Sequence, residues 1–509
     1  MSRRNIGRIV MVVWIAALAW LARRQLFQGE ASSMTASAAR LSPDAKYFRV
    51  DAGTLQIGVL NLNWDTLPTG FKMQELLALD LPVGEGIRRH LALTEITTTR
   101  ALTLQTASRR TSNPTGSQTV LVEAQIDTLQ AYSVSTDGKG GPTVRQIGPR
   151  PTIAGILPLR LAYGNRLVAG EVIAEPVADL ERRRTTTLSG SVLGDTTFIL
   201  PDSVEYDTLA SVWRTITIDT LQAWHLSVDA GGLPEQWWVD GVGRLVRVET
   251  LFGVTLTRSP FDYSHTLYRD SLRMSGPVPR RTLAGLRSLA TSGIRLDTAT
   301  ATLSYRLSRV DRPLDPSAID HLAGGAQASD SGILTISRQW PTGSDSAPAG
   351  YLDPPTGRRE PTGRTRLLAD TAFAGATTAR DSVIRLTRWV SQRVTLDTSS
   401  MGYPEVVPAA RRWTGTPAAM AGFLVALARA GGLPARVVTG LAVAGGELLS
   451  HAWAEVWIGG RWTPVDPVSG HAPASARLLR IAEGGQGRPF ETLWRTAALR
   501  VETLTPGGR

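Results

Sequence analysis

The sequence predicts an α+β fold, in which a β-rich N-terminal region of antiparallel sheets precedes a smaller α+β domain. Strand patterns dominate from residue 47 to about residue 258, and "RTITID" at 214–219 alternates polar and β-branched residues as a half-buried strand does. "EQWWVDGVGRLVRVET" at 235–250 is typical of two strands joined by an Asp-Gly turn. Near the C-terminus, residues 415–440 carry the pattern of a helix followed by a strand.

The composition describes a folded chain with several domains. Its 509 residues suffice for about two to four domains, with 42% hydrophobic and 19% charged residues. The net charge is +11, but the arginines are scattered and form no dense basic helix, so nucleic acid is not an expected partner. The sequence contains no cysteine, which excludes disulfides, thiolate metal sites and a cysteine nucleophile together.

The N-terminus indicates export through a membrane. An uncharged apolar run from Ile9 to Ala22 follows three arginines and is followed by two more. Fourteen residues are fewer than the roughly 20 that span a bilayer, but snorkelling arginines can make up the difference. We expect residues 1–24 to be an uncleaved signal anchor in the inner membrane, with the bulk of the chain periplasmic. A cleaved signal peptide ending near the small residues 36–38 is the alternative.

The rest of the chain divides by composition. A polar tether at 25–45 leads into a β-rich exported region at 46–282 and a second β segment at 283–345. Residues 346–364 lie in a Pro-, Gly- and Ser-rich stretch that is typical of a linker. The α+β domain is expected at 365–490, followed by a C-terminal tail at 491–509. Its first helix is predicted at 379–394, where apolar residues gather on one face.

The helix and strands of 415–466 follow from local patterns. Met420, Phe423, Leu424 and Leu427 have the i, i+3, i+4, i+7 spacing of a helix packed on a core. Two glycines and a proline at 431–434 end that helix, and "ARVVTGLAV" at 435–443 is a buried strand. "HAWAEVW" at 451–457 and "RWTPVD" at 461–466 form a hairpin around a Gly-Gly turn.

The order "ALARAGGLPARVVTG" (426–440) and "HAWAEVWIGGRWTPVDP" (451–467) resembles the transglutaminase-like superfamily, whose members share the fold of papain-like thiol enzymes. The resemblance is strong over about residues 380–470. It implies a Cys–His–Asp constellation in which a thiolate attacks an amide carbonyl. His451 and Asp466 match the family's histidine and carboxylate.

The family's cysteine is missing. Aligned without gaps, its usual Gly-Asp-Cys becomes Gly415-Thr416-Pro417. Proline has neither a nucleophile nor an N–H, and threonine before proline is a favourable helix start. We therefore interpret Thr416 as a helix cap and Pro417 as the place of the lost nucleophile. His451 and Asp466 are then expected to persist as a structural pair.

The sequence thus predicts a catalytically degenerate protein of the bacterial cell envelope that binds or scaffolds a peptide or protein. One alternative is an active amide hydrolase or acyltransferase that uses Thr416, Ser450 or an unrecognised site. Another is lipid or lipoprotein binding by the β-rich region. No nucleotide loop or HExxH spacing is present, so neither a cofactor nor a metal is expected, and the aspartates at 311, 315 and 320 match no calcium loop.

Overall fold

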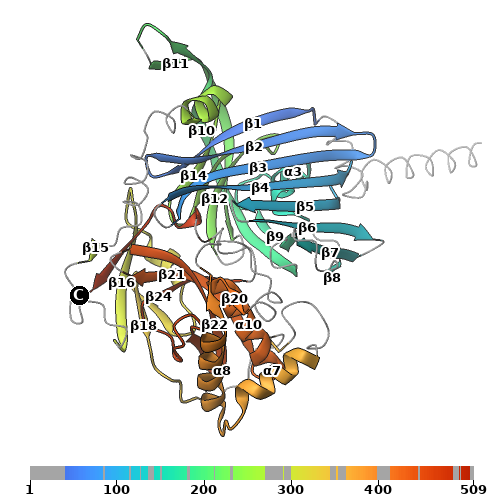
Figure 1. Cartoon of the computed structure of the whole chain (residues 1–509). Helices are drawn as coiled ribbons and strands as arrows, with labels where there is room; N and C mark the ends of the chain where they lie inside the picture. The colour runs from blue at the N-terminus through green and yellow to red at the C-terminus, as the bar shows by residue number, and fades with distance from the viewer. Residues whose placement is uncertain are drawn as a thin grey trace, which may run out of the picture.

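The computed structural model describes residues 41–83, 86–113, 116–125, 128–135, 143–149, 152–179, 184–210, 212–229, 233–269, 290–291, 300–343, 351–352, 363–397, 413–444, 447–484, 492 and 494–504. Within these ranges, no helix is both long and apolar enough to cross a membrane. The signal anchor predicted at 1–24 lies outside the described residues and stays a prediction. The architecture is α+β, as predicted, with a large antiparallel sheet in the N-terminal part (Figure 1).

The large sheet has fourteen strands in the order β8-β7-β6-β5-β4-β3-β2-β1-β14-β13-β12-β11-β10-β9. Neighbouring strands pair antiparallel, and most are joined by short turns, as expected of a meander. The strands are β1 (Asp44–Ala52), β2 (Leu55–Leu67), β3 (Gly70–Val83), β4 (Gly86–Thr99), β5 (Leu104–Asn113), β6 (Gly116–Gln125), β7 (Thr128–Ser135), β8 (Thr143–Pro149), β9 (Val172–Asp179), β10 (Arg184–Asp207), β11 (Val212–Asp229), β12 (Pro234–Asp240), β13 (Leu245–Thr250) and β14 (Val254–Ser259).

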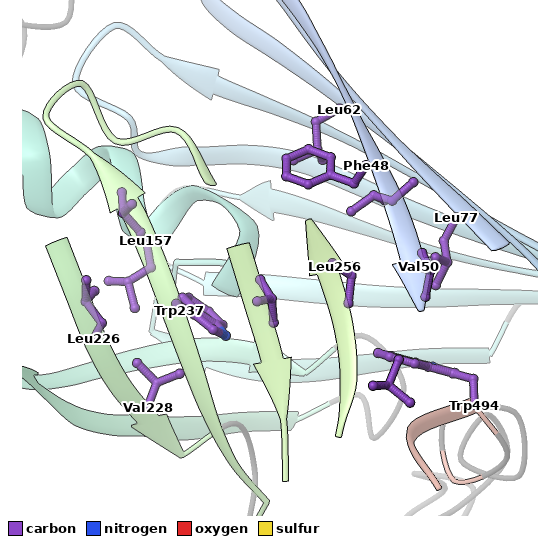
Figure 2. Packing of buried hydrophobic residues seen from close by; sticks show 14 of the residues in the cluster. Phe48, Val50, Leu62, Leu77, Leu157, Leu226, Val228, Trp237, Leu256 and Trp494 are labelled. Carbon is purple, nitrogen blue, oxygen red and sulfur yellow. The ribbon is translucent and has the colours of Figure 1, made fainter. Parts of the chain in front are cut away.

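The large sheet curls around a short helical segment, η1 (Ala154–Ile156) and α3 (Leu157–Tyr163). Its two ends approach each other after β8, where Thr152 N donates to Pro176 O at 2.9 Å and Ala178 N donates to Thr152 O at 2.7 Å. The resulting core combines side chains of α3 with those of strands far apart in the sheet order, including Phe48, Leu157 and Leu226 (Figure 2). Burial of this apolar surface is the main force that bends the sheet.

The Asp-Gly hairpin predicted at 235–250 is confirmed as β12 and β13. Asp240 Oδ1 accepts the N–H groups of Val242 and Arg244 at 3.1 and 2.8 Å, and Gly243 takes the left-handed conformation with φ of 83°. The hairpin at β10 and β11 is different. The prediction that 214–219 forms a half-buried strand is wrong in its burial, because residues 214–218 are all exposed within β11. The alternating pattern predicted the strand correctly, but the side chains on both of its faces are exposed there.

A second sheet has five strands in the order β15-β25-β16-β18-β17. It joins distant parts of the chain, because β25 (Leu499–Leu504) pairs antiparallel with β16 (Thr302–Arg309) and parallel with β15 (Ala290–Thr291). The remaining strands are β17 (Gln327–Asp330) and β18 (Ile333–Ser337), with the short helix α6 (Pro316–Asp320) beside them. Residues 499–504, which the sequence places in a C-terminal tail, are therefore a strand of the same sheet as the second β segment.

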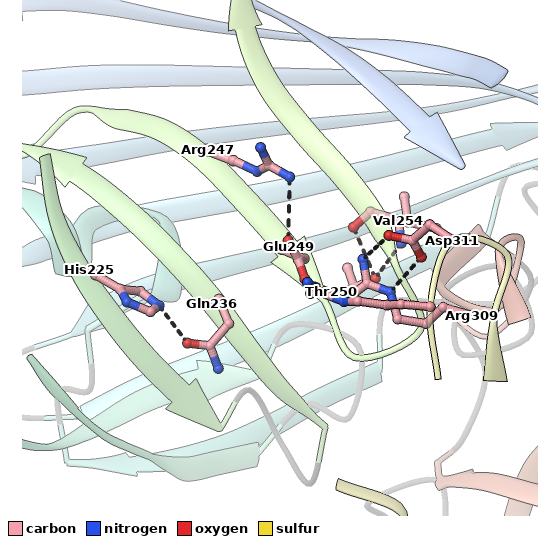
Figure 3. Close-up of polar contacts among 9 residues, drawn as sticks. His225, Gln236, Arg247, Glu249, Thr250, Val254, Arg309 and Asp311 are labelled. Carbon is pink, nitrogen blue, oxygen red and sulfur yellow. Dashed lines mark hydrogen bonds and ion pairs between the residues drawn. The ribbon is translucent and has the colours of Figure 1, made fainter. Parts of the chain in front are cut away.

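Polar and apolar contacts fasten this second sheet to the large one. Trp494 lies in the core of the large sheet (Figure 2). Arg495 forms an ion pair with Glu235 of β12. Arg309 Nη1 donates to Glu249 Oε1 of β13 at 2.5 Å, and its Nε donates to Asp311 Oδ1 at 3.0 Å (Figure 3). The C-terminal segment is thus part of the N-terminal region's core.

The remaining residues form the predicted α+β domain. Its helices are α7 (Gly363–Phe373), α8 (Ala379–Arg393) and α10 (Pro417–Ala430), and α8 confirms the helix predicted at 379–394. A four-stranded antiparallel sheet has the order β23-β22-β21-β24, with β21 (Ala435–Ala444), β22 (Glu447–Ile458), β23 (Arg461–Val465) and β24 (Leu478–Glu483). Two short parallel strands, β19 (Thr395–Leu396) and β20 (Thr414–Gly415), connect the end of α8 to the start of α10.

Candidate functional site

Helix α10 begins where the resemblance places a cysteine. Thr416 has the extended backbone of a cap residue, and its Oγ1 accepts a hydrogen bond from Ala419 N at 3.3 Å. Pro417 is the first helical residue, where its missing N–H leaves no helical bond unmade. Thr416 is only 9% exposed. The interpretation of Thr416 as a helix cap is confirmed.

The body of α10 is held by the apolar stripe that the sequence predicts. Met420, Phe423, Leu424 and Leu427 are all buried, and they pack with residues of α7, α8, β21 and β22. In the last turn of α10, Arg429 Nε donates to Ala435 O at 2.8 Å. This hydrogen bond ties the end of the helix to the start of β21.

The histidine and the carboxylate come together on the four-stranded sheet. His451 lies in β22 and Asp466 follows β23, and His451 Nε2 is 3.2 Å from Asp466 Oδ1. An ionised carboxylate can only accept hydrogen bonds, so Nε2 carries the proton and Nδ1 remains as the basic nitrogen of the ring. A histidine whose tautomer is fixed by a carboxylate can act as a base through its other ring nitrogen.

Asp466 also organises the turn after β23. Its Oδ1 accepts Val468 N at 3.0 Å, and its Oδ2 accepts the Ser469 hydroxyl at 2.7 Å. Burial raises the pKa of Asp466, but the hydrogen bond and charge of His451, with the bonds from Ser469 and Val468, outweigh it and leave that pKa lowered. Asp466 is therefore held ionised, and it has a structural role whether or not His451 acts as a base.

The close approach of strands explains Gly440, which pairs with His451 across β21 and β22. A Cβ on Gly440 would lie 2.0 Å from the carbonyl oxygen of Leu479 and 2.8 Å from the ring of Trp453. Only glycine fits that position. The indole of Trp453, 1% exposed, lies 6.1 Å from the imidazole of His451 at an interplanar angle of 21°. Gly440 thus supports the packing behind the histidine.

A buried ion network beside this pair was not foreseen from the sequence. Arg436 Nη2 lies 2.6 Å from Glu455 Oε2, and Arg436 Nη1 donates to Glu483 Oε2 at 3.0 Å. The guanidinium also lies over the Trp462 ring at 4.2 Å. Burial lowers the pKa of Arg436, but the charges of Glu455 and Glu483 outweigh it and raise that pKa. Arg436, Glu455 and Glu483 are charged residues in strands rich in apolar residues, and this is the signal that could have predicted the network.

In the part of the chain that the structure describes, the other candidates make no side-chain hydrogen bond to this pair. Among the described residues, the side chain of His451 hydrogen-bonds to Asp466 alone, and the hydroxyl of Thr416 bonds to Ala419 alone. Ser450 precedes His451 in β22, so its side chain points to the opposite face of the sheet. Asp315 caps α6 through Ser317 N at 3.0 Å. No cluster of three or more metal-binding side chains occurs in the described ranges.

The domain thus combines a helix that begins at a threonine cap with a small antiparallel sheet that brings a histidine and a carboxylate into contact. Residues 366–467 match the family model of the Transglutaminase-like superfamily. They form a transglutaminase-like domain, and the protein is a transglutaminase-like domain protein that lacks the superfamily's cysteine.

Known structures and sequences add little beyond this family. A proposed cysteine protease from Cytophaga hutchinsonii is 20% identical with a TM-score of 0.25, and the match covers 35% of this chain and 66% of that one, just short of two thirds. A β-barrel-like protein of unknown function from Brucella abortus is 9% identical with a TM-score of 0.32, over 43% of this chain and 96% of that one. These TM-scores are too low to support an argument. No curated protein sequence matches.

Proposed function

We propose that this is a membrane-anchored protein of the bacterial cell envelope whose transglutaminase-like domain binds a peptide or protein segment without catalysing acyl transfer. The groove that served an acyl substrate in active relatives would hold the ligand. The anchor at residues 1–24 would keep the domain at the membrane surface. The chain would act as a binding or scaffolding module there.

The start of α10 carries the proposal. In thiol enzymes this position supplies a thiolate, which the helix dipole activates. Here the sequence has no cysteine, and the nearest hydroxyl, on Thr416, accepts the N–H of Ala419. Thr416 is also an internal residue, so it lacks the free terminal amine that activates threonine nucleophiles. Pro417 removes a backbone donor as well as the nucleophile.

The residues around the site that match the family's pattern also have structural roles in this domain. Gly440 is fixed by strand packing, and Arg436 is held in a buried ion network. Removing one partner of such a network would leave a buried charge unpaired, at a cost of about 3–5 kcal/mol. These residues therefore hold the sheet of the domain in shape. The proposal is that the domain keeps the acyl-acceptor groove that the family resemblance implies, and that an extended peptide binds there.

A single-cysteine reporter tests this proposal, because the chain has no other cysteine. Pro417→Cys in the full chain would be labelled with an environment-sensitive thiol dye and titrated with peptides from envelope proteins. Ala379→Cys is the matched control, since Ala379 is the first residue of α8 as Pro417 is of α10. We expect a saturable signal from position 417 that is absent at 379. Equal signals at both positions, or none at either, would refute binding in this groove.

A further inference from the structure

The hairpin of β10 and β11 extends far beyond its neighbours. Strand β9 pairs with β10 only over Arg184–Ser191, and β12 pairs with β11 only over Ala223–Asp229. Beyond these limits, among the described strands, residues 192–207 of β10 pair only with β11, and residues 212–222 of β11 pair only with β10. We call residues 192–210 and 212–222 the arm. In Figure 1 it projects from the end of the molecule opposite α7 and α8.

The arm exposes apolar side chains along its length. Ile199 is 70% exposed, Ile218 is 64% exposed, and Leu209 at the tip is 98% exposed. Tyr206 and Trp213 face each other across the ribbon, with ring centroids 5.4 Å apart. An isolated two-stranded ribbon is marginally stable in water, and its unpaired edges are open to further contacts. Such a surface indicates a binding partner.

The charge of the arm restricts that partner. Five carboxylates, at 195, 202, 205, 207 and 219, stand against Arg214 alone, which gives the arm a net charge of −4. The whole chain carries +11, so the remainder carries +15. Anionic lipid would repel the arm, and so would the arm of another copy. A basic protein surface with exposed apolar groups fits best.

The chain itself has such a surface on α7 and α8. These helices contain six arginines, at 364, 366, 380, 385, 388 and 393, and two aspartates, which together give +4. All six arginines are exposed. Leu367, which follows Arg366 in α7, is 69% exposed. Because this face and the arm lie at opposite ends of one molecule (Figure 1), the two can meet only between copies.

We propose that the arm of one copy docks on the α7–α8 face of a second copy. The two surfaces differ, so the contact is head-to-tail, and an open assembly keeps a free arm at one end and a free face at the other. Opposite charges of equal size align the copies, and the exposed apolar side chains add buried area. The association should weaken as salt is raised, since exposed charges are screened within about 3 Å at 1 M salt.

Charge reversal tests this contact. The full chain would be studied by sedimentation in density-matched detergent, where the native protein should exceed its monomer mass of 54.7 kDa as concentration rises. Asp202→Arg with Glu205→Arg brings the charge of the arm from −4 to 0, and Arg366→Glu with Arg388→Glu brings that of the helical face from +4 to 0. Each double variant alone should sediment as a monomer. An equimolar mixture of the two should form dimers, because the native arm of the helical-face variant then meets the native face of the arm variant.

Asp320→Arg with Asp330→Arg is the matched control, since both aspartates are exposed outside the arm. It should associate like the native chain, and circular dichroism should show every variant folded. A native chain that stays monomeric at all concentrations would overturn the proposal. So would an arm-reversed variant that still associates, a mixture that does not, or arm-dependent binding to anionic vesicles without self-association.

Discussion

Two threonine caps in the same domain allow the role of Thr416 to be measured against an internal standard. Thr416 Oγ1 accepts Ala419 N at 3.3 Å, and Thr378 Oγ1 accepts Asp381 N at 3.1 Å at the start of α8. Losing a threonine cap costs about 0.5–2 kcal/mol. Both bonds are longer than the usual 2.9–3.0 Å. We therefore expect Thr416→Ala and Thr378→Ala each to cost about 1 kcal/mol or slightly less.

Hydrogen exchange by mass spectrometry would measure this locally. Peptides covering residues 416–422 should lose about fivefold protection in Thr416→Ala, which corresponds to about 1 kcal/mol. Thr416→Asn and Thr416→Ser should keep native protection, because both side chains cap a helix well. Thr416→Ala with unchanged protection, or Thr416→Asn as damaging as alanine, would refute the capping argument. The hydroxyl would then be available for another role.

Three further predictions concern the framework, each measured by denaturant unfolding of the full chain. Trp494→Ala should destabilise the protein by about 3–5 kcal/mol, because it leaves a cavity in the core of the large sheet. Trp213→Ala in the arm should cost about 1 kcal/mol or less. Equal costs would contradict the placement of Trp494 in the core. Gly440→Ala should cost about 1–3 kcal/mol or more, because the added Cβ clashes with β24. Gly363→Ala should change stability by about 0.5 kcal/mol at most, since no described atom lies within 4 Å of a Cβ at that position. A neutral Gly440→Ala would contradict the packing. The pKa of Asp466 is lowered in the folded state, so its contribution to the free energy of unfolding is present above the unfolded pKa of about 3.9 and is lost as pH falls through the folded pKa. The native chain and Asp466→Asn should therefore converge in stability at low pH. A stability difference that stays constant with pH would contradict this.

Local patterns predicted the elements around the site. The apolar spacing from Met420 to Leu427 identified α10, and the threonine–proline pair before it identified the cap. Glycine turns and alternation likewise identified the hairpins. These features are determined by residues a few positions apart, so a single sequence carries them.

Contacts between residues far apart in the sequence could not be predicted from local patterns. Arg495 and Glu235 are 260 positions apart, and nothing near either residue indicates the other. The period-2 pattern at 214–219 showed which residues share a face of the ribbon, but burial depends on contacts with distant residues, and residues 214–218 are exposed. The buried pair of Arg436 and Glu455 depends in the same way on the register of β21 and β22.

The central claim is that the fold of a thiol enzyme persists here without its chemistry. Turnover of amide and ester substrates by the full chain tests it most directly, with Thr416→Ala and His451→Ala measured beside the native protein. The account predicts no hydrolysis or acyl transfer above the level of either variant. Turnover by the native chain that both substitutions abolish, in variants that remain folded, would contradict it and make Thr416 and His451 a working catalytic pair.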